Sequence, residues 1–319
     1  MKLTFLGTSA GKPTKERNVS ALALELEQDN KWYLFDCGEG TQHQLMRAHP
    51  SVGKLAVIFV THLHGDHIFG LPGLLASKRL DRALRPLRIY GPKGIAAFVE
   101  CFTETTFDYL GYDLEIIEYR AGECFVFDRF RVTVLPLVHS IESHAFLIRE
   151  NDISNRLDEA KLRADGLDPS PLYGELKKGR TVTYEGRAYE PQHYMLEPVR
   201  GRSVIIAGDN ADPSVLGDAL KGLDLLVHEC TYTQAVYDAL IDKQLHTTAR
   251  SLGRTAHASG VRNLIATHIS PRFGGGPHPL AEIEEEIRAS YNGPLFIAED
   301  FDVFRLARDG RIEREKLQV

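Results

Sequence analysis

Three histidines and one aspartate occupy four of the six positions in residues 62–67, HLHGDH. Neutral imidazole and carboxylate are ligands that zinc accepts, so this density of both groups suits a metal site better than a packed core. The segment directly follows residues 55–60, LAVIFV, an apolar run typical of a buried strand. Such a strand carries the chain to one edge of a sheet and leaves these side chains in the turn beyond it. We therefore expect two transition metals side by side at this edge.

Four other residues of ligand type follow strand-like runs in the same way. They are Asp36, His139, Asp209 and His268, after the stretches 32–35, 130–138, 204–207 and 263–267. Because these strands are expected to end at the same sheet edge as the histidine-rich segment, their side chains should converge on the metals.

Strand-like and helix-like stretches alternate along most of the chain. Strands are expected at 2–6, 21–27, 32–36, 55–60, 87–90, 114–119, 123–127, 130–137, 144–149, 203–207, 223–228, 262–267, 294–297 and 302–307, with helices at 40–49 and 66–80. Two β-rich halves with covering helices predict an α/β fold, a four-layer αββα sandwich. Residues from about 150 to 200 are polar and lack a long apolar period. We expect one domain over residues 1–319, with this segment as a protruding inserted arm.

Composition indicates a soluble cytoplasmic protein. The 319 residues are 43% hydrophobic and carry a net charge of −6, so binding of nucleic acid would depend on local basic patches. The four cysteines show no CxxC spacing, which indicates reduced thiols. The amino terminus lacks the features of a signal peptide, and no apolar run is long enough to span a bilayer.

The chain order Asp, HxHxDH, His, Asp, His resembles that of the metallo-β-lactamase superfamily, over essentially the whole length. The resemblance implies two Zn²⁺ per subunit, with Mn²⁺ as an alternative. One ion would be held by His62, His64 and His139, and the other by Asp66, His67 and His268. Asp209 would bridge the two ions, while Asp36 would orient a ligand imidazole.

Three further motifs resemble those of the tRNA 3′-processing endonucleases of the RNase Z family. Residues 13–18, PTKERN, fit the PxKxRN loop; residues 228–231, HECT, are close to HEAT, with Cys230 in place of alanine; and residues 298–300, AED, fit the AxD loop. In this family a histidine before Ser or Thr pairs with the HEAT glutamate, which implies that Glu229 holds His246 as a proton donor.

The resemblance also implies roles for other residues of these motifs. His228 would support the site from outside the ligand set, and Asp66 would orient the attacking water or accept its proton. The loop residues expected to meet RNA phosphates beside the site are Lys15, Arg17 and Asn18.

Residues 167–180 resemble the GP-motif region of the arm with which the family grips the tRNA elbow, usually across a homodimer. Lys177, Lys178 and Arg180 cluster beside Tyr173, which is expected to be exposed and suited, with them, to phosphates and ribose. Ser170 stands where the motif usually has glycine, and it would strain the turn if that position needs a positive φ.

These features together predict a zinc-dependent endoribonuclease that removes the 3′ trailer from precursor tRNA. Hydrolysis by water would leave a 3′-hydroxyl on the tRNA and a 5′-phosphate on the trailer. One alternative is a di-zinc hydrolase of a small-molecule ester or phosphodiester, which shares the ligands but has no use for the PTKERN loop or the arm. Another is a catalytically silent RNA-binding protein, which has no reason to keep seven ligands.

Overall fold

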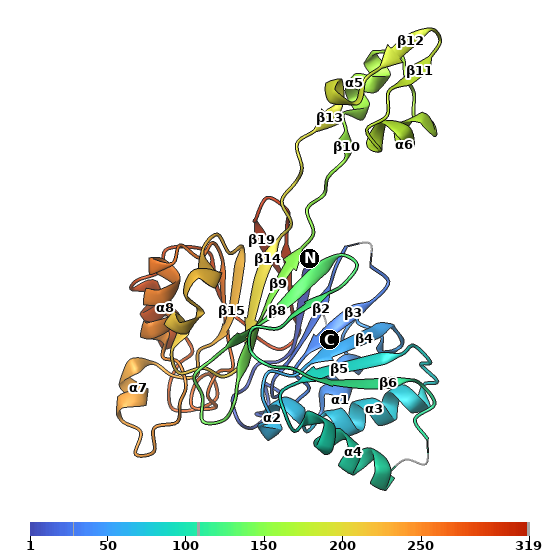
Figure 1. Cartoon of the computed structure of the whole chain (residues 1–319). Coiled ribbons are helices and arrows are strands. Elements are labelled where there is room, and N and C mark those ends of the chain that lie inside the picture. Colours follow the sequence, from blue (N-terminus) through green and yellow to red (C-terminus); the bar gives the residue numbers. More distant parts are fainter. Residues whose placement is uncertain (28, 107–108, 318–319) are drawn as a thin grey trace. The chain divides into compact units, whose positions relative to one another are not determined.

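The computed structural model of the protein describes residues 1–27, 29–106 and 109–317. The chain divides into two compact units, one formed by Met1–Arg149 with Ser203–Val319 and the other by Glu150–Arg202 (Figure 1). All the ligand-type residues named above belong to the first unit.

Two β-sheets form the centre of the first unit. The eight-stranded sheet has the order β19-β18-β1-β2-β3-β4-β5-β6, and the seven-stranded sheet has the order β17-β16-β15-β14-β9-β8-β7. The strands of the first sheet are β1 (Lys2–Gly7), β2 (Ala21–Glu25), β3 (Trp32–Phe35), β4 (Leu55–Phe59), β5 (Leu87–Gly91), β6 (Leu114–Glu118), β18 (Asp302–Leu306) and β19 (Ile312–Lys316). Those of the second are β7 (Cys124–Val126), β8 (Phe130–Pro136), β9 (His144–Glu150), β14 (Ser203–Ala207), β15 (Leu225–Glu229), β16 (Leu264–Thr267) and β17 (Leu295–Ile297).

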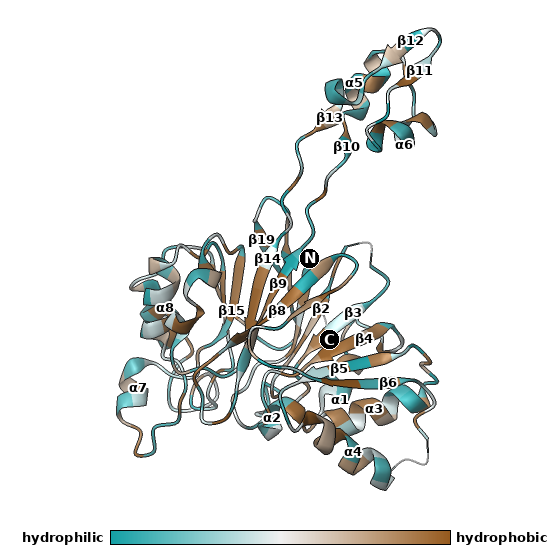
Figure 2. Cartoon of the chain, viewed as in Figure 1, coloured by the Kyte–Doolittle hydropathy of each residue, from teal (hydrophilic) through white to brown (hydrophobic). Residues whose placement is uncertain are grey.

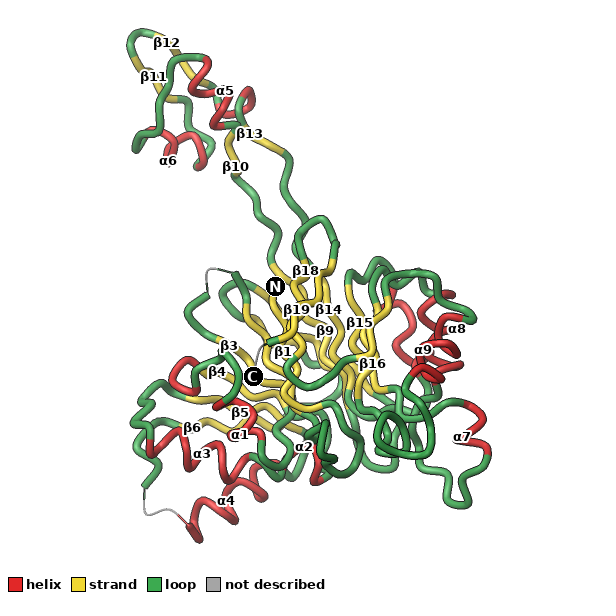
Figure 3. Tube along the Cα trace, turned by 180° about the vertical axis from the view of Figure 1, so that it is seen from behind, coloured by secondary structure: helices red, strands yellow, loops and turns green. Residues whose placement is uncertain are grey.

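Helices cover the outer face of each sheet. The first sheet packs against α1 (Thr41–Met46), α3 (Leu71–Leu80) and α4 (Ile95–Thr106), and the second against η3 (Pro213–Leu220), α8 (Ala249–Ala258) and α9 (Ala281–Arg288) (Figure 3). Two shorter helices, α2 (Gly65–Ile68) and α7 (Gln234–Asp238), lie at the sheet edge where the ligand residues gather. The expected four-layer αββα sandwich is therefore confirmed.

Strand β4 shows why this sequence forms a sandwich. Val57 and Phe59 belong to the core between the sheets, whereas Ile58 and Val60 belong to the core under the helices. Since alternate side chains of a strand point to opposite faces, a strand buried on both faces must be apolar throughout. Figure 2 shows these apolar strands at the centre of the first unit.

One predicted helix differs from the structure, and one strand was not predicted. The helix expected over 66–80 is interrupted at Gly70, where a Cβ atom would lie 2.0 Å from the carbonyl oxygen of Gly38, so the chain must turn closely past that loop. Strand β19 was not expected, because it is an exposed edge strand with charged residues that lacks an apolar pattern.

The second unit contains a small core that its polar composition concealed. Its elements are β10 (Arg156–Leu157), α5 (Glu159–Ala164), α6 (Leu172–Lys177), β11 (Val182–Tyr184), β12 (Arg187–Tyr189), η2 (Pro191–His193) and β13 (Met195–Leu196). The core side chains are Leu157, Leu162, Leu167, Tyr173, Leu176, Val182, Tyr189 and Tyr194. They were not recognised because they are distributed over short elements that show no sustained period.

The prediction of an exposed Tyr173 is therefore wrong. Its ring packs in this core, the residue is only 7% exposed, and its hydroxyl donates a hydrogen bond of 2.8 Å to the carbonyl of Leu167. Ser170 does not belong to the described non-glycine residues with positive φ, so the strain considered for this position does not arise. Among the described residues, no helix is long and apolar enough to cross a membrane.

Candidate metal centre

The ligand-type residues follow strands at one edge of the two sheets, most of them in loops and Asp66 and His67 in the short helix α2. His62 and His64 follow β4, His139 follows β8, Asp209 follows β14 and His268 follows β16. His268 has a φ of 55°, in the left-handed region that non-glycine residues rarely adopt. Asp36, after β3, has a φ of 58°. Strained backbone of this kind persists where the surrounding structure holds a side chain in one direction.

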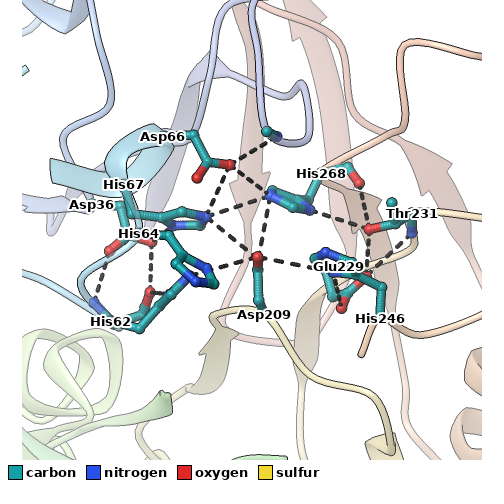
Figure 4. Close-up of polar contacts among 12 residues, drawn as sticks. Asp36, His62, His64, Asp66, His67, Asp209, Glu229, Thr231, His246 and His268 are labelled. Atoms are coloured by element: carbon teal, nitrogen blue, oxygen red, sulfur yellow. Dashed lines mark hydrogen bonds and ion pairs between the residues drawn. The ribbon is translucent and has the colours of Figure 1, made fainter. Parts of the chain in front are cut away.

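The structure brings the seven proposed ligands together in two groups. Figure 4 labels all of them except His139. In the first group, one ring nitrogen each of His62, His64 and His139 and one carboxylate oxygen of Asp209 lie within 4.8 Å of one another. The second, with the same spacing, contains Asp66, His67 and His268.

Asp209 faces both groups with different oxygens. Its Oδ2 lies 3.6 Å from Nε2 of His62 and 3.7 Å from Nε2 of His139. Its Oδ1 lies 3.4 Å from Nε2 of His67 and 3.3 Å from Nε2 of His268. This is the arrangement that a carboxylate shared by two cations requires.

Two buried atoms of the site lack a hydrogen-bond partner within the described part of the chain, Nε2 of His62 and Oδ1 of Asp209. Buried polar atoms without partners are costly, and here both point toward the ligand groups. Imidazole nitrogens with carboxylate oxygens suit a divalent transition metal, so the donor set fits a pair of such ions.

Burial and neighbouring charges favour the metal-binding forms of His62 and Asp209, whereas Asp209, Asp36 and Asp66 outweigh burial and raise the pKa of His67, so His67 must lose a proton when a metal binds. Burial, together with the nearby His67, lowers the pKa of His62 well below its usual value, which favours neutral imidazole. Burial would raise the pKa of Asp209, but the adjacent His268 and His67 outweigh it and hold the carboxylate ionised. Metal ions compete with protons for both kinds of group, so neutral imidazole and ionised carboxylate are the required states.

Asp36 contacts a ligand from outside the ligand set. His67 donates from Nδ1 to Oδ2 of Asp36 at 2.7 Å, which leaves Nε2 directed at the ion site. Asp36 also accepts from the backbone N–H and the hydroxyl of Thr61, at 2.7 and 2.9 Å. Thr61, which directly precedes the histidine-rich segment, was not among the predicted site residues.

Replacing Asp36 by asparagine should weaken binding of added Zn²⁺ by about 10- to 100-fold, the usual effect of losing such a partner. Both carboxylate oxygens of Asp36 accept hydrogen bonds, from Thr61 and from His67, whereas the uncharged amide of asparagine has only one oxygen that can accept. Competition with a chromogenic chelator measures this affinity. Asp113→Asn, at an exposed position, is the matched control, and equal affinity of Asp36→Asn and wild type would show that Asp36 does not support the site.

Glu229 is buried and holds His246 in the site. His246 lies 3.0 Å from Glu229, Nδ1 to Oε1, and the same carboxylate accepts hydrogen bonds from the backbone N–H groups of Asn210, Thr231 and Thr247. Burial alone would lower the pKa of His246, but the charge and hydrogen bond of Glu229 raise it to about 9. His246 is therefore held as an imidazolium, which can donate a proton.

His228 lies beside this pair without facing the ions. Its Nδ1 donates to the carbonyl of Glu229 at 2.7 Å, and its Nε2 accepts from the side-chain amide of Asn210 at 2.9 Å. Because Asn210 follows Asp209 directly, these contacts support the loop that carries the shared carboxylate.

The loop 13–18 makes contacts within the protein that were not predicted. Arg17 is only 8% exposed, and its Nη1 donates to the hydroxyl of Thr8 and the carbonyl of Ala298, at 2.7 and 2.6 Å. These contacts fix the Arg17 side chain in place, and its predicted role toward phosphates stays a prediction. Asn18 donates from its backbone to Asp300 at 2.6 Å, so the loop is fastened to residues 298–300.

The remaining cations proposed for RNA lie elsewhere. Lys15 lines a hollow with Gln44, Arg47 and Lys316, which is separate from the one beside the metal groups. Lys177, Lys178 and Arg180 belong to the second unit, where Lys178 and Arg180 pair with Glu175 at 2.8 and 2.7 Å.

A hollow of about 410 Å³ opens beside the two ligand groups. It is lined by Ala10, Gly11, His64, Asp66, His139, Ser140, Asp209, Thr231, Tyr232, Lys243, Gln244, Leu245, His246, His268, Ser270 and Pro271. Proposed ligands and the imidazolium of His246 thus face the same space, which suits hydrolysis of a substrate that needs a proton donor on one side.

Comparison with known proteins gives whole-length similarities. A ribonuclease Z of Marinobacter nauticus is 42% identical over 320 aligned residues, covering 98% of this chain and 99% of the relative. A ribonuclease BN of Escherichia coli is 42% identical over 312 residues, covering 96% and 100%. A family model described as Anti-Pycsar protein Apyc1 matches residues 1–106.

Solved structures give the same fold. Human tRNase Z, short form, is 28% identical with a TM-score of 0.67, covering 96% of this chain and 100% of that chain. The metallo-β-lactamase fold protein YhfI of Bacillus subtilis is 19% identical with a TM-score of 0.65, covering 98% and 99%. The second similarity concerns the fold alone.

Proposed function

This chain belongs to the ribonuclease Z family, and we propose that it is the endoribonuclease that removes the 3′ trailer from precursor tRNA. Similarity at 42% identity over nearly the whole length of both chains supports the activity. The observation that carries the chemistry is the pair of ligand groups that share Asp209, one oxygen facing each.

We propose two Zn²⁺ per subunit, with Mn²⁺ suited to the same nitrogen and oxygen donors. The first ion would be held by His62, His64 and His139 and the second by Asp66, His67 and His268, with Asp209 shared. When bound, such a pair polarises the scissile phosphate and makes water a stronger nucleophile at neutral pH.

Asp66 would orient the attacking water or accept its proton. Its Oδ2 accepts the backbone N–H of Gly11 at 2.8 Å and lies 3.3 Å from Nε2 of His268. These contacts leave the carboxylate at the wall of the hollow. The neighbouring His67 and His268 outweigh burial and hold the pKa of Asp66 below its usual range, which favours the role of orienting the water because such a carboxylate is a weak base.

His246 would protonate the departing 3′ oxygen of the tRNA, as the imidazolium held by Glu229 permits. Because water is the nucleophile, the reaction needs no 2′-hydroxyl. The products are then a tRNA with a 3′-hydroxyl and a trailer with a 5′-phosphate.

Incubation with a 3′-extended precursor tRNA and mapping of both product ends tests this function. Freshly purified protein, or protein supplied with Zn²⁺ or Mn²⁺, should cut once at the 3′ end and leave the two termini named above. A 2′,3′-cyclic phosphate on the tRNA would exclude attack by water. Absence of cleavage with either metal would exclude the activity.

We further propose that Glu150–Arg202 acts as the arm that binds tRNA, and that the protein works in the cytoplasm as a homodimer. The likeness of residues 167–180 to the GP-motif region supports the arm, and the four cysteines are present as free thiols. Analytical ultracentrifugation measures the oligomeric state.

Replacing residues 155–197 by Asn-Gly should lower kcat/KM for precursor tRNA by on the order of a hundredfold, because a second binding site on the same substrate is lost. The join is favourable, since Ile153 and Val199 already pair through hydrogen bonds of 2.9 and 3.0 Å and Asn-Gly forms a tight hairpin turn. Hydrolysis of bis(p-nitrophenyl) phosphate is the control and should stay within a few-fold. Equal kcat/KM of the deletion variant and wild type on precursor tRNA would show that Glu150–Arg202 is not a tRNA-binding arm.

A further inference from the structure

The hollow beside His246 contains one cation that the proposed mechanism leaves unused. Of the described residues that line it, Lys243 alone is a lysine or an arginine. It lies in residues 239–248, the segment between α7 and α8, called the α7–α8 loop below. The cations of loop 13–18 that the sequence predicted to bind RNA do not line the hollow beside His246, because Arg17 is buried and Lys15 lines another hollow.

The ammonium group of Lys243 is available to a ligand. The side chain is exposed and has no ion-pair partner within the described ranges. Its Nζ lies 5.6 Å from the centroid of the Tyr237 ring, which in turn lies 6.1 Å from the ring of Tyr232 in the wall of the hollow. A cation near an aromatic face is held only weakly, so a phosphate can recruit it.

The α7–α8 loop is fastened to the site directly after Lys243. The carbonyl of Leu245 accepts a hydrogen bond of 2.8 Å from Nδ1 of His139, and His246 pairs with Glu229 at 3.0 Å. Four consecutive positions therefore present a cation, an acceptor for a proposed metal ligand and the proposed proton donor. The cation is thus placed on the proton-donor side of the hollow.

We propose that Lys243 is a positioning residue that binds the RNA backbone phosphate on the 5′ side of the last retained nucleotide. The inference rests on the proposed function, in which His246 faces the 3′ oxygen of that nucleotide. Along the retained tRNA, the next phosphate toward the 5′ end is then the one nearest the α7–α8 loop. Lysine binds phosphate as a compact charge on a flexible stem, which gives affinity and register without reading the base.

A cycle of protein and substrate changes tests the contact. Wild type and Lys243→Ala are compared on precursor tRNA with either the normal linkage or a neutral methylphosphonate at the proposed phosphate. Each single change should lower kcat/KM by about tenfold, the usual loss for a hydrogen bond to a charged group, and the two together should lower it no further.

Two further readouts separate contact from a structural effect. Lys243→Arg should retain most activity, and Lys243→Ala should reduce the slope of log kcat/KM against log salt concentration by about 1, as expected for one lost phosphate contact. Lys54→Ala, at an exposed position outside the hollow, is the matched control and should behave as wild type.

The assignment would be overturned if the losses in kcat/KM caused by Lys243→Ala and by the methylphosphonate at the proposed linkage multiply when the two changes are combined. Coupling of Lys243 to a methylphosphonate on the trailer side of the cut would overturn it as well. If wild type itself leaves precursor tRNA intact, the proposed function fails. If wild type and Lys243→Ala cleave with equal kcat/KM, only the role of Lys243 fails.

Discussion

Replacing Asp209 by asparagine is expected to lower metal content below about one ion per chain and cleavage of precursor tRNA by more than about a thousandfold. The two oxygens of Asp209 face different ligand groups, with Oδ2 toward His62 and His139 and Oδ1 toward His67 and His268. The amide has one oxygen and one NH₂ group, so it can serve one group only. Losing a single donor to a transition state already costs on the order of a hundred- to thousandfold, and this change affects both ion sites.

Elemental analysis of freshly purified protein and initial rates measure the two effects. Asp218→Asn is the matched control, because Asp218 is exposed and pairs only with Lys221 among the described contacts. A circular dichroism spectrum equal to that of wild type would show that the variant is folded. Two bound ions and normal turnover in Asp209→Asn would contradict the shared carboxylate.

Replacing His246 by alanine is expected to lower cleavage by on the order of 10²- to 10⁴-fold, the usual contribution of general acid catalysis, while both ions are retained. His246 acts as an acid, so its protonated form is the active one. Burial opposes this form, but Glu229 raises the pKa to about 9, so wild-type activity that depends on His246 should fall as pH rises through about 9. The variant should lack this alkaline decline.

A substrate with sulfur in place of the departing 3′ oxygen tests the role directly. A thiolate leaves without protonation, so His246→Ala should cleave this substrate at a rate close to that of wild type. His257→Ala, at an exposed position, is the matched control. If the sulfur substrate restores nothing, His246 does not protonate the leaving group.

The amino-acid sequence by itself located the seven proposed ligands and Asp36. Each ligand-type residue follows an apolar run, and a strand buried on both faces is continuous in sequence, so the ends of strands can be located without a structure. The fold class followed from the same runs. Patterns within short segments were sufficient to locate the ligands and the strands, because a residue's ligand chemistry and a strand's run of apolar residues are both properties of a short segment.

Tertiary structure alone decided how these groups and their neighbours are used. Arg17 is buried because it reaches Ala298, 281 positions away, and Tyr173 is buried because short elements of the second unit close around it. The nearness of Lys243 to the ligand groups likewise depends on the contact between Leu245 and His139, 106 residues apart. Burial and pairing are set by contacts between distant segments, and no pattern within one segment contains them.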